Sequence, residues 1–261
     1  FDDLKATVDK AKAKDETEVF SNDSKKKIYM HWMYDVPMGE QLDDDGDSLE
    51  SIEGCLTDAQ YNRDEHRKAV IDDILDNWVS QSHNGKFHAI LATSSIPEAI
   101  KYYKLFAQRD CGLKTTAVFD PSDGNNESSI EKIDGIAQML EDYNSLFGTC
   151  FNISGYASFK RDVCARLAHK TPYTAVENEP SKCLDILIVV DQMLTGYDSK
   201  WLNTLYMDKF YKWSNIEMII QAFSRTNRVF NDDKPHGIIR YYRRPYTMKN
   251  IIEYAFEQYS G

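Results

Sequence analysis

From residue 61 onward, hydrophobic positions alternate between two spacings along the chain. Continuous apolar runs are typical of buried strands, and apolar residues at three- and four-residue spacing are typical of amphipathic helices. Alternation of the two predicts an α/β fold, an open sandwich of doubly wound type in which a mostly parallel sheet carries helices on both faces. Such sheets bind ligands at the carboxyl ends of their strands. Strands are predicted at 87–93, 115–119, 185–190, 204–207 and 237–241, and helices at 61–82, 129–147, 158–169, 215–226 and 251–259, with a further helix opening at Pro97.

The region before residue 61 has a different character. Residues 1–60 lack sustained periodicity apart from one short helix near the start, and QLDDDGDSLE is typical of an exposed acidic loop. We interpret 1–60 as an extension or linker from a preceding domain, 61–245 as the compact domain and 246–261 as the start of a C-terminal helical region. Because the chain begins with Phe1 and stops at Gly261 within a helical pattern, we expect a piece of a longer protein.

Composition narrows the class of protein. The sequence is 42% hydrophobic, which is more than disordered chains carry. No apolar stretch approaches the roughly 20 residues needed to cross a bilayer, and the start lacks a signal-peptide pattern, so we expect a soluble, cytoplasmic protein with no membrane partner. The five cysteines form no CxxC pair, which argues for reduced thiols and against a metal site.

Charge is distributed unevenly along the chain. A net charge of −11 argues against a protein whose whole surface wraps nucleic acid. Basic residues nevertheless gather in the C-terminal third, at Arg225, Arg228, Arg240, Arg243 and Arg244. A phosphate-binding surface is therefore predicted late in the chain.

The segment IIQAFSRTNRVF carries the most specific chemistry. Gln221, Arg225 and Arg228 are spaced i, i+4 and i+7, which predicts that they share one face of a helix. Guanidinium groups are always charged and bind phosphate oxygens bidentately, so this face suits a transferring phosphoryl group. The alternative is a solvated helix face with salt bridges.

Two longer stretches resemble motifs of a known family. QAFSRTNR resembles motif VI of superfamily-2 helicases, in the sequence variant typical of the motor (R) subunit of type I restriction-modification enzymes. Upstream, DILIVVDQMLTGYDSKWLNTLYMDK resembles motif V of that family, and EDYNSLFGT and HGIIRYYR match it in the same order. The resemblance covers residues 61–245 and implies the second RecA-like domain of an ATP-driven DNA motor.

In that family, arginines of motif VI reach ATP that is held mainly by the first RecA-like domain. The resemblance implies that Arg225 and Arg228 contact the γ-phosphate, with Arg228 as the arginine finger and Gln221 supporting the contact. In motif V, it implies that Thr195 contacts the DNA backbone and that Gly196 and Asp198 belong to the ATP interface. The alternatives are an ordinary turn glycine at Gly196, and a helix cap or salt-bridge partner at Asp198.

Other candidate contacts to DNA lie earlier in the chain. Thr93, Ser94 and Ser95 resemble motif IV, whose small polar groups can bond DNA phosphates, although a simple helix N-cap is an equally good interpretation. Arg161 and Arg166 precede motif V and could add phosphate contacts. Their alternative is again a solvated helix face.

The parts that would make the chain a complete enzyme are missing from the sequence. Asp191 ends an apolar strand as a magnesium-binding acidic residue would, but no GxxxxGK[ST] phosphate loop exists in the chain. No carboxylate–carboxylate–lysine cluster of a nuclease is evident either. ATP and Mg²⁺ are therefore expected on the first RecA-like domain, and the isolated chain is expected to bind no cofactor and to be inactive.

The resemblance thus implies a domain of an ATP-dependent type I site-specific deoxyribonuclease that translocates duplex DNA before cleavage. Its expected partners are duplex DNA, the first RecA-like domain of the same chain, and the methyltransferase and specificity subunits. One alternative is the second motor domain of another superfamily-2 DNA translocase. Another is a non-motor α/β module that binds a nucleotide or a protein, which would tolerate loss of Arg225 and Arg228.

Overall fold

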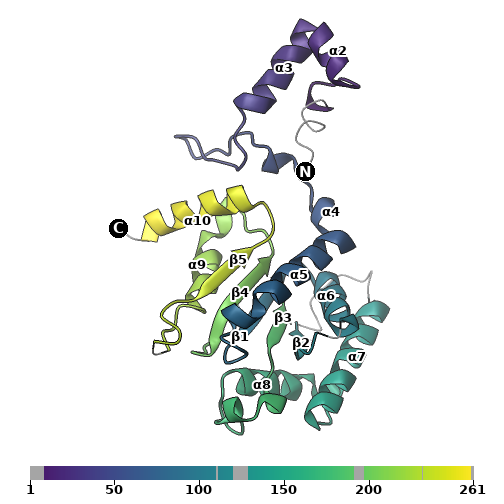
Figure 1. Cartoon of the computed structure of the whole chain (residues 1–261), viewed down its shortest axis with the longest axis vertical. Helices are drawn as coiled ribbons and strands as arrows, with labels where there is room; N and C mark the ends of the chain where they lie inside the picture. The colour runs from purple at the N-terminus through teal and green to yellow at the C-terminus, as the bar shows by residue number, and fades with distance from the viewer. Residues whose placement is uncertain (1–8, 110, 120–128, 191–196, 231, 260–261) are drawn as a thin grey trace. The chain divides into compact units, whose positions relative to one another are not determined.

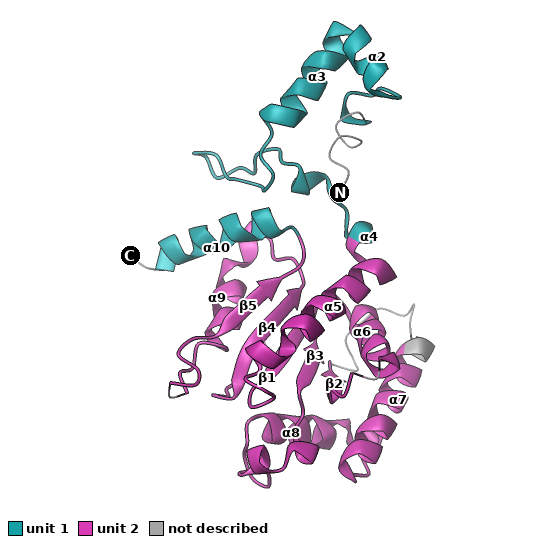
Figure 2. Cartoon of the chain, in the orientation of Figure 1, with its two compact units in different colours: residues 1–60, 244–261 teal, residues 61–243 magenta. Residues whose placement is uncertain are grey.

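The chain divides into two compact units (Figure 2). Unit 1 comprises residues 1–60 together with 244–261, and unit 2 comprises residues 61–243. The computed structural model describes residues 9–109, 111–119, 129–190, 197–230 and 232–259, and only the backbone of 129–131.

Unit 2 is built on a five-stranded parallel sheet (Figure 1). Its strand order is β2-β3-β1-β4-β5, and every neighbouring pair is parallel. All residues of β1, β3 and β4 are buried, as expected for a parallel sheet covered on both faces. The predicted fold class, a RecA-like α/β open sandwich, is confirmed. The strands are β1 (His88–Thr93), β2 (Thr115–Val118), β3 (Ile186–Val189), β4 (Leu202–Asp208) and β5 (Ile238–Tyr241).

Helices cover both faces of this sheet. In Figure 1, α5 (Asp64–Gln81) and α6 (Ile96–Gln108) lie in front of the strands and α9 (Ile216–Ser224) lies behind them. α7 (Ser129–Phe147) packs against α6 and β2, and its Tyr143 ring meets Phe159 of α8 (Tyr156–Leu167) with centroids 5.0 Å apart. Short 3₁₀ helices occupy Ile153–Gly155, Val176–Asn178, Pro180–Lys182 and Trp213–Asn215.

The helix predicted at 215–226 ends earlier than its apolar spacing suggests. After Ser224 the backbone tightens, because Thr226 N–H donates to the Phe223 carbonyl at 3.2 Å and the Thr226 hydroxyl donates to the same oxygen at 3.0 Å. A Cβ on Gly237 would lie 2.3 Å from the Thr226 hydroxyl oxygen, so these two chain segments touch directly. The chain therefore leaves the helix before Arg225, and the prediction that Gln221, Arg225 and Arg228 share one helix face is wrong.

Unit 1 has more regular structure than the single short helix predicted for residues 1–60. Its helices are α2 (Glu16–Ser21), α3 (Asp23–Tyr34), the 3₁₀ turn Glu53–Cys55 and α10 (Pro245–Tyr259), and α4 (Asp58–Tyr61) crosses the boundary between the units. The buried Glu53 carboxylate accepts the backbone N–H groups of Tyr246 at 3.0 Å and Thr247 at 2.7 Å, at the N-terminus of α10 where a negative charge is favoured. None of the helices described here is long and apolar enough to span a membrane.

A buried ionic network lies at the carboxyl end of β4 in unit 2. Asp208 is fully buried and accepts hydrogen bonds from Arg243 Nε at 2.9 Å and the Tyr102 hydroxyl at 2.9 Å, with His66 Nε2 at 2.7 Å. Burial alone would raise the pKa of Asp208, but the hydrogen bonds from His66 and Arg243 hold it below its ordinary value. This carboxylate therefore compensates a buried arginine and ties β4 to both α5 and α6.

Asp208→Asn is expected to lower the free energy of unfolding by about 3–5 kcal/mol, because Arg243 stays buried without its charged partner. Urea denaturation followed by circular dichroism measures the change. Asp233→Asn is the matched control, since that exposed carboxylate pairs with Lys86 at the surface and its loss changes stability little. Equal losses in the two variants would contradict a special role for the network.

Candidate functional site

The two candidate arginines lie at the amino-terminal edge of the sheet. Arg225 donates from Nη1 to the Tyr197 carbonyl oxygen at 3.3 Å. The Tyr197 hydroxyl in turn lies 3.1 Å from Nε2 of His88, the first residue of β1. Ligands were expected at the carboxyl ends of the strands, so these arginines occupy the opposite edge from the one that general sheet topology favours.

The structure brings Arg228 together with Asp198. The Arg228 Nε and an Asp198 carboxylate oxygen form an ion pair, and the two side chains are 58% and 48% exposed. Asp198 therefore has the salt-bridge partner that was the alternative interpretation of this residue. Because both groups are accessible to water, their attraction is weak, and the guanidinium is open to another anion.

Gln221 is exposed on α9, and Arg225 follows the last helical residue. Thr195 and Gly196, as well as Asp191, lie outside the described residues. Of the residues predicted at the ATP interface, Arg225, Arg228 and Asp198 therefore lie close together in the structure.

Lys234, which we did not predict as a site residue, lies beneath this group. Its side chain is completely buried, and its Nζ donates to the carbonyl oxygens of Arg228 at 2.7 Å and Lys200 at 3.3 Å. Burial lowers the pKa of Lys234 to about 8. The ammonium thus joins two chain segments, 197–201 and 225–230, that carry Asp198 and Arg228.

Aromatic side chains pack around the same two segments. Trp201 lies against Phe230 with ring centroids 4.6 Å apart, and Phe87 meets Phe230 at 5.6 Å. His169 stacks on Trp201 at 3.9 Å. These ring contacts join the two segments to each other and to the start of β1.

The motif IV candidates lie at the other edge of the sheet, after β1. Thr93 is completely buried and donates its hydroxyl to the Val189 carbonyl at 3.1 Å, which argues against the predicted contact to a DNA phosphate. Ser95 caps α6 by accepting the Glu98 N–H at 3.4 Å, as the alternative interpretation proposed. Ser94 is exposed at this edge.

The two arginines of α8 differ sharply in environment. Arg161 is exposed and donates to Ser158 at 3.1 Å. Arg166 is buried, and its three side-chain nitrogens donate within unit 2, to Tyr143, to the Lys182 carbonyl, and to Tyr173 and Asp162. These contacts argue against the predicted phosphate contact, because Arg166 instead holds the interior together.

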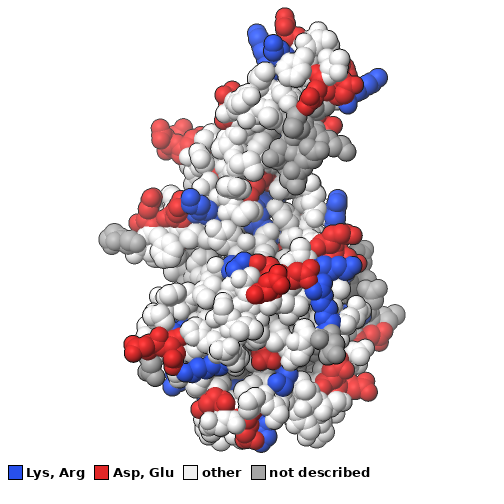
Figure 3. Space-filling view, in the orientation of Figure 1, with Lys and Arg blue, Asp and Glu red and all other residues white. Residues whose placement is uncertain are grey.

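Exposed charges do not gather into a basic stripe on the face shown in Figure 3. Blue and red side chains alternate there, and the described residues form no continuous basic track on that face. The described residues also contain no group of three His, Cys, Asp or Glu side chains placed to hold a metal ion.

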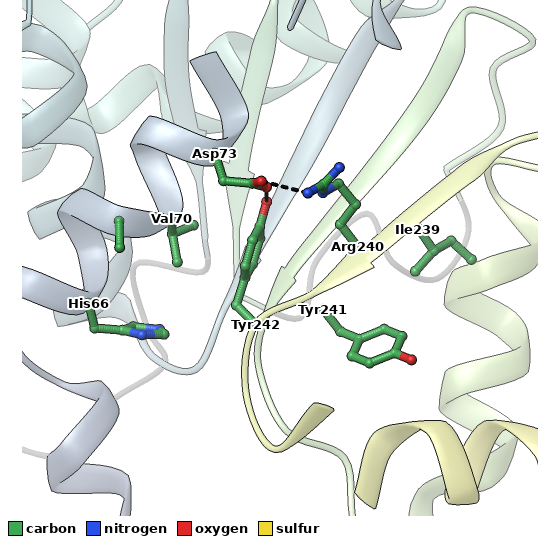
Figure 4. A pocket seen from close by; sticks show the side chains of 8 residues that line it. His66, Val70, Asp73, Ile239, Arg240, Tyr241 and Tyr242 are labelled. Atoms are coloured by element: carbon green, nitrogen blue, oxygen red, sulfur yellow. Dashed lines mark hydrogen bonds and ion pairs between the residues drawn. The ribbon is translucent and has the colours of Figure 1, made fainter. Parts of the chain in front are cut away.

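A hollow of about 600 Å³ opens beside the edge strand β5 (Figure 4). Asp73 of α5 accepts hydrogen bonds there from Arg240 Nη2 at 2.5 Å and from the Tyr242 hydroxyl at 2.8 Å. The arginine is thus already neutralised by a carboxylate. Asp73 thus ties β5 and the residue that follows it to α5.

Comparison with known proteins matches the family model described as type I restriction enzyme subunit R domain 3 to residues 85–244. The chain belongs to this family. An endonuclease subunit of a type I restriction enzyme from Staphylococcus saprophyticus is 32% identical over 213 residues, which is 78% of this chain and 22% of that protein. The corresponding subunit from Staphylococcus aureus is 31% identical over 200 residues, covering 74% of this chain and 20% of the relative.

The predicted resemblance to the R subunit is thereby confirmed. A shorter match, 44% identical over 61 residues, joins 23% of the chain to 6% of a type I restriction enzyme endonuclease subunit from Methanocaldococcus jannaschii that is described as putative. The chain spans about a fifth of the length of the staphylococcal relatives and therefore corresponds to one part of an R subunit.

The buried lysine generates a test by pH. The folded pKa of Lys234 is about 8 against an ordinary value of 10.5, so between these values the unfolded chain keeps a proton that the folded chain has lost. The free energy of unfolding of the wild type is therefore expected to rise, relative to Lys234→Met, as pH increases through this window. The gain is lost as pH falls through about 8.

Urea denaturation of both proteins across this pH range measures the difference. Lys104→Met, which removes an exposed lysine of α6, is the control and is expected to show no such slope. A constant difference between wild type and Lys234→Met would contradict the lowered pKa.

Proposed function

We propose that this chain acts as the second RecA-like motor domain of a type I restriction enzyme R subunit. In this role residues 61–245 close on the first RecA-like domain around ATP and open after hydrolysis, which moves the enzyme along duplex DNA before cleavage. The observation that supports it best is the convergence of Arg225, Arg228 and Asp198 at one exposed edge of the sheet. Family membership supplies the context.

Arg228 serves as the arginine finger in this proposal. Water attacks the γ-phosphorus, the bond to the bridging oxygen breaks, and ADP and phosphate leave. Negative charge on the transferring group is stabilised by a guanidinium that is permanently charged and aimed at its oxygens. Arg225 contributes a second guanidinium, Gln221 supports them from α9, and Gly196 and Asp198 complete the interface.

ATP and Mg²⁺ bind mainly to the first RecA-like domain in this scheme. In this scheme the chain's own contribution is positive charge at the γ-phosphate. The chain by itself is expected to bind no cofactor and to turn over no ATP, because the phosphate-binding loop must come from another domain.

Contacts to the DNA backbone are assigned to Thr195, Ser94 and Arg161, of which the last two are exposed. Thr93, Ser95 and Arg166 are left out because their polar groups serve the interior or a helix cap. The methyltransferase and specificity subunits are the remaining proposed partners, and the complex works in the cytoplasm, where ATP and duplex DNA meet.

Arg228→Ala is expected to reduce DNA-stimulated ATP hydrolysis by the full-length R subunit, in complex with its partner subunits, by about 100-fold or more. The loss follows from an uncompensated charge on the transferring phosphoryl group. Steady-state phosphate release with saturating duplex DNA measures it, and circular dichroism verifies the fold.

Arg63→Ala is the matched control, since this exposed arginine precedes α5 and its side chain makes no hydrogen bond that caps the helix. Unchanged hydrolysis in Arg228→Ala would make the non-motor α/β module the better interpretation. Loss of hydrolysis in both variants would point to a general effect of surface charge.

A further inference from the structure

Lys234 makes contacts with both segments that carry the proposed ATP-interface residues. Its Nζ lies 2.7 Å from the carbonyl oxygen of Arg228 and 3.3 Å from that of Lys200, which follows Asp198 by two positions. The Lys234 side chain is fully buried, so it cannot reach a ligand itself. Lys234 can therefore affect the site only through the main chain of Arg228 and Lys200.

The backbone of Lys234 holds the same stretch a second time. Lys234 N–H donates to the Phe230 carbonyl at 3.1 Å, and Phe230 N–H donates to the Lys234 carbonyl at 3.0 Å. These two bonds form an isolated β-bridge, and the Lys234 side chain bonds to the Arg228 carbonyl. Residues 228 and 230 are therefore bound to one lysine by three hydrogen bonds.

Packing fixes the remaining parts of segment 225–230. Thr226 is buried and touches Gly237 so closely that a Cβ on the glycine would lie 2.5 Å from the Thr226 carbonyl oxygen. The Phe230 ring packs on Trp201 of the neighbouring segment at 4.6 Å. Arg228 by contrast exposes 58% of its side chain, so an accessible guanidinium stands on a hydrogen-bonded and packed backbone.

Burying an amine is unfavourable unless hydrogen bonds compensate it. A methionine would fill similar space without that cost, so the distinctive contribution of Lys234 is its pair of bonds to two main-chain carbonyls. Those bonds set the spacing between segment 197–201 and segment 225–230. They consequently set where Arg228 stands relative to Asp198 and to any phosphate that meets them.

We propose that Lys234 is a positioning residue for Arg228, holding the main chain of the finger at the distance from segment 197–201 that hydrolysis requires. This inference rests on the proposed function, since it concerns the same reaction. A misplacement of about 1 Å at a catalytic group can lower the rate about 100-fold, so loss of the hydrogen bonds that hold the Arg228 backbone should lower the rate of hydrolysis strongly. In the proposed function, binding of ATP depends mainly on the other domain, so loss of Lys234 should change ATP affinity little.

The test is a double-mutant cycle in the full-length R subunit assembled with its partner subunits and saturated with duplex DNA. Release of radiolabelled phosphate resolves the residual turnover of slow variants. Lys234→Met is expected to lower kcat by about 10- to 100-fold while KM for ATP changes by less than about threefold. In the Arg228→Ala background the same substitution is expected to leave kcat unchanged, because no finger is left to position.

A residue with a purely structural role would behave differently. Its loss would reduce kcat by the same factor whether or not Arg228 is present, and that result would overturn the proposal. Unchanged kcat in a folded Lys234→Met protein would overturn it as well. If Arg228→Ala is slow while Lys234→Met is not, only this inference fails, whereas full activity of Arg228→Ala removes the proposed function.

Two further variants complete the design. Lys104→Met removes an exposed lysine of α6 and is expected to keep wild-type kcat. Lys234→Gln keeps a hydrogen-bond donor and is expected to recover part of the rate lost in Lys234→Met. If Lys234→Met does not fold, the cycle is run with Lys234→Gln, and failure of both to fold assigns the lysine to folding and overturns the positioning role.

Discussion

Complete burial of the central strands constrains everything else in unit 2. Every residue of β1, β3 and β4 is buried, so the backbone of these strands bonds to neighbouring strands while their side chains pack between the sheet and the elements that cover it. Functional groups can leave such a sheet only at its two ends. Arg225, Arg228 and Asp198 use the amino-terminal edge, and Ser94 uses the carboxyl-terminal edge.

Ionic groups that enter the interior behind these edges are each compensated, but in different ways. Asp208 faces Arg243 at 2.9 Å and Arg67 faces Glu98 at 2.7 Å, so charge meets charge. Lys234 donates to two main-chain carbonyls, and burial lowers its pKa. Such groups add little net stability, and their value lies in fixing which segments meet.

Local patterns in the sequence were sufficient to predict the sheet but not to predict all residues of the candidate site. The apolar run 115–119 became β2 at Thr115–Val118, because a strand buried on both faces must be apolar. The apolar spacing through 215–226 predicted too long a helix, since the helix ends at Ser224 and the next residues pack against Gly237, a contact that no local signal marks. Lys234 stands in a polar NDDKPH stretch typical of an exposed turn, and the stretch itself gives no sign that the side chain is buried.

In the proposed motor, the weakness of the pair between Arg228 and Asp198 becomes useful. An exposed ion pair is worth about 0–1 kcal/mol in water, so Asp198 holds the guanidinium without trapping it. When another domain closes and excludes water, attraction to a phosphate carrying more negative charge strengthens several-fold. The guanidinium then exchanges its carboxylate for the phosphate while the backbone beneath it stays in place. A finger of this kind is engaged only when ATP and both domains are present, which couples hydrolysis to closure.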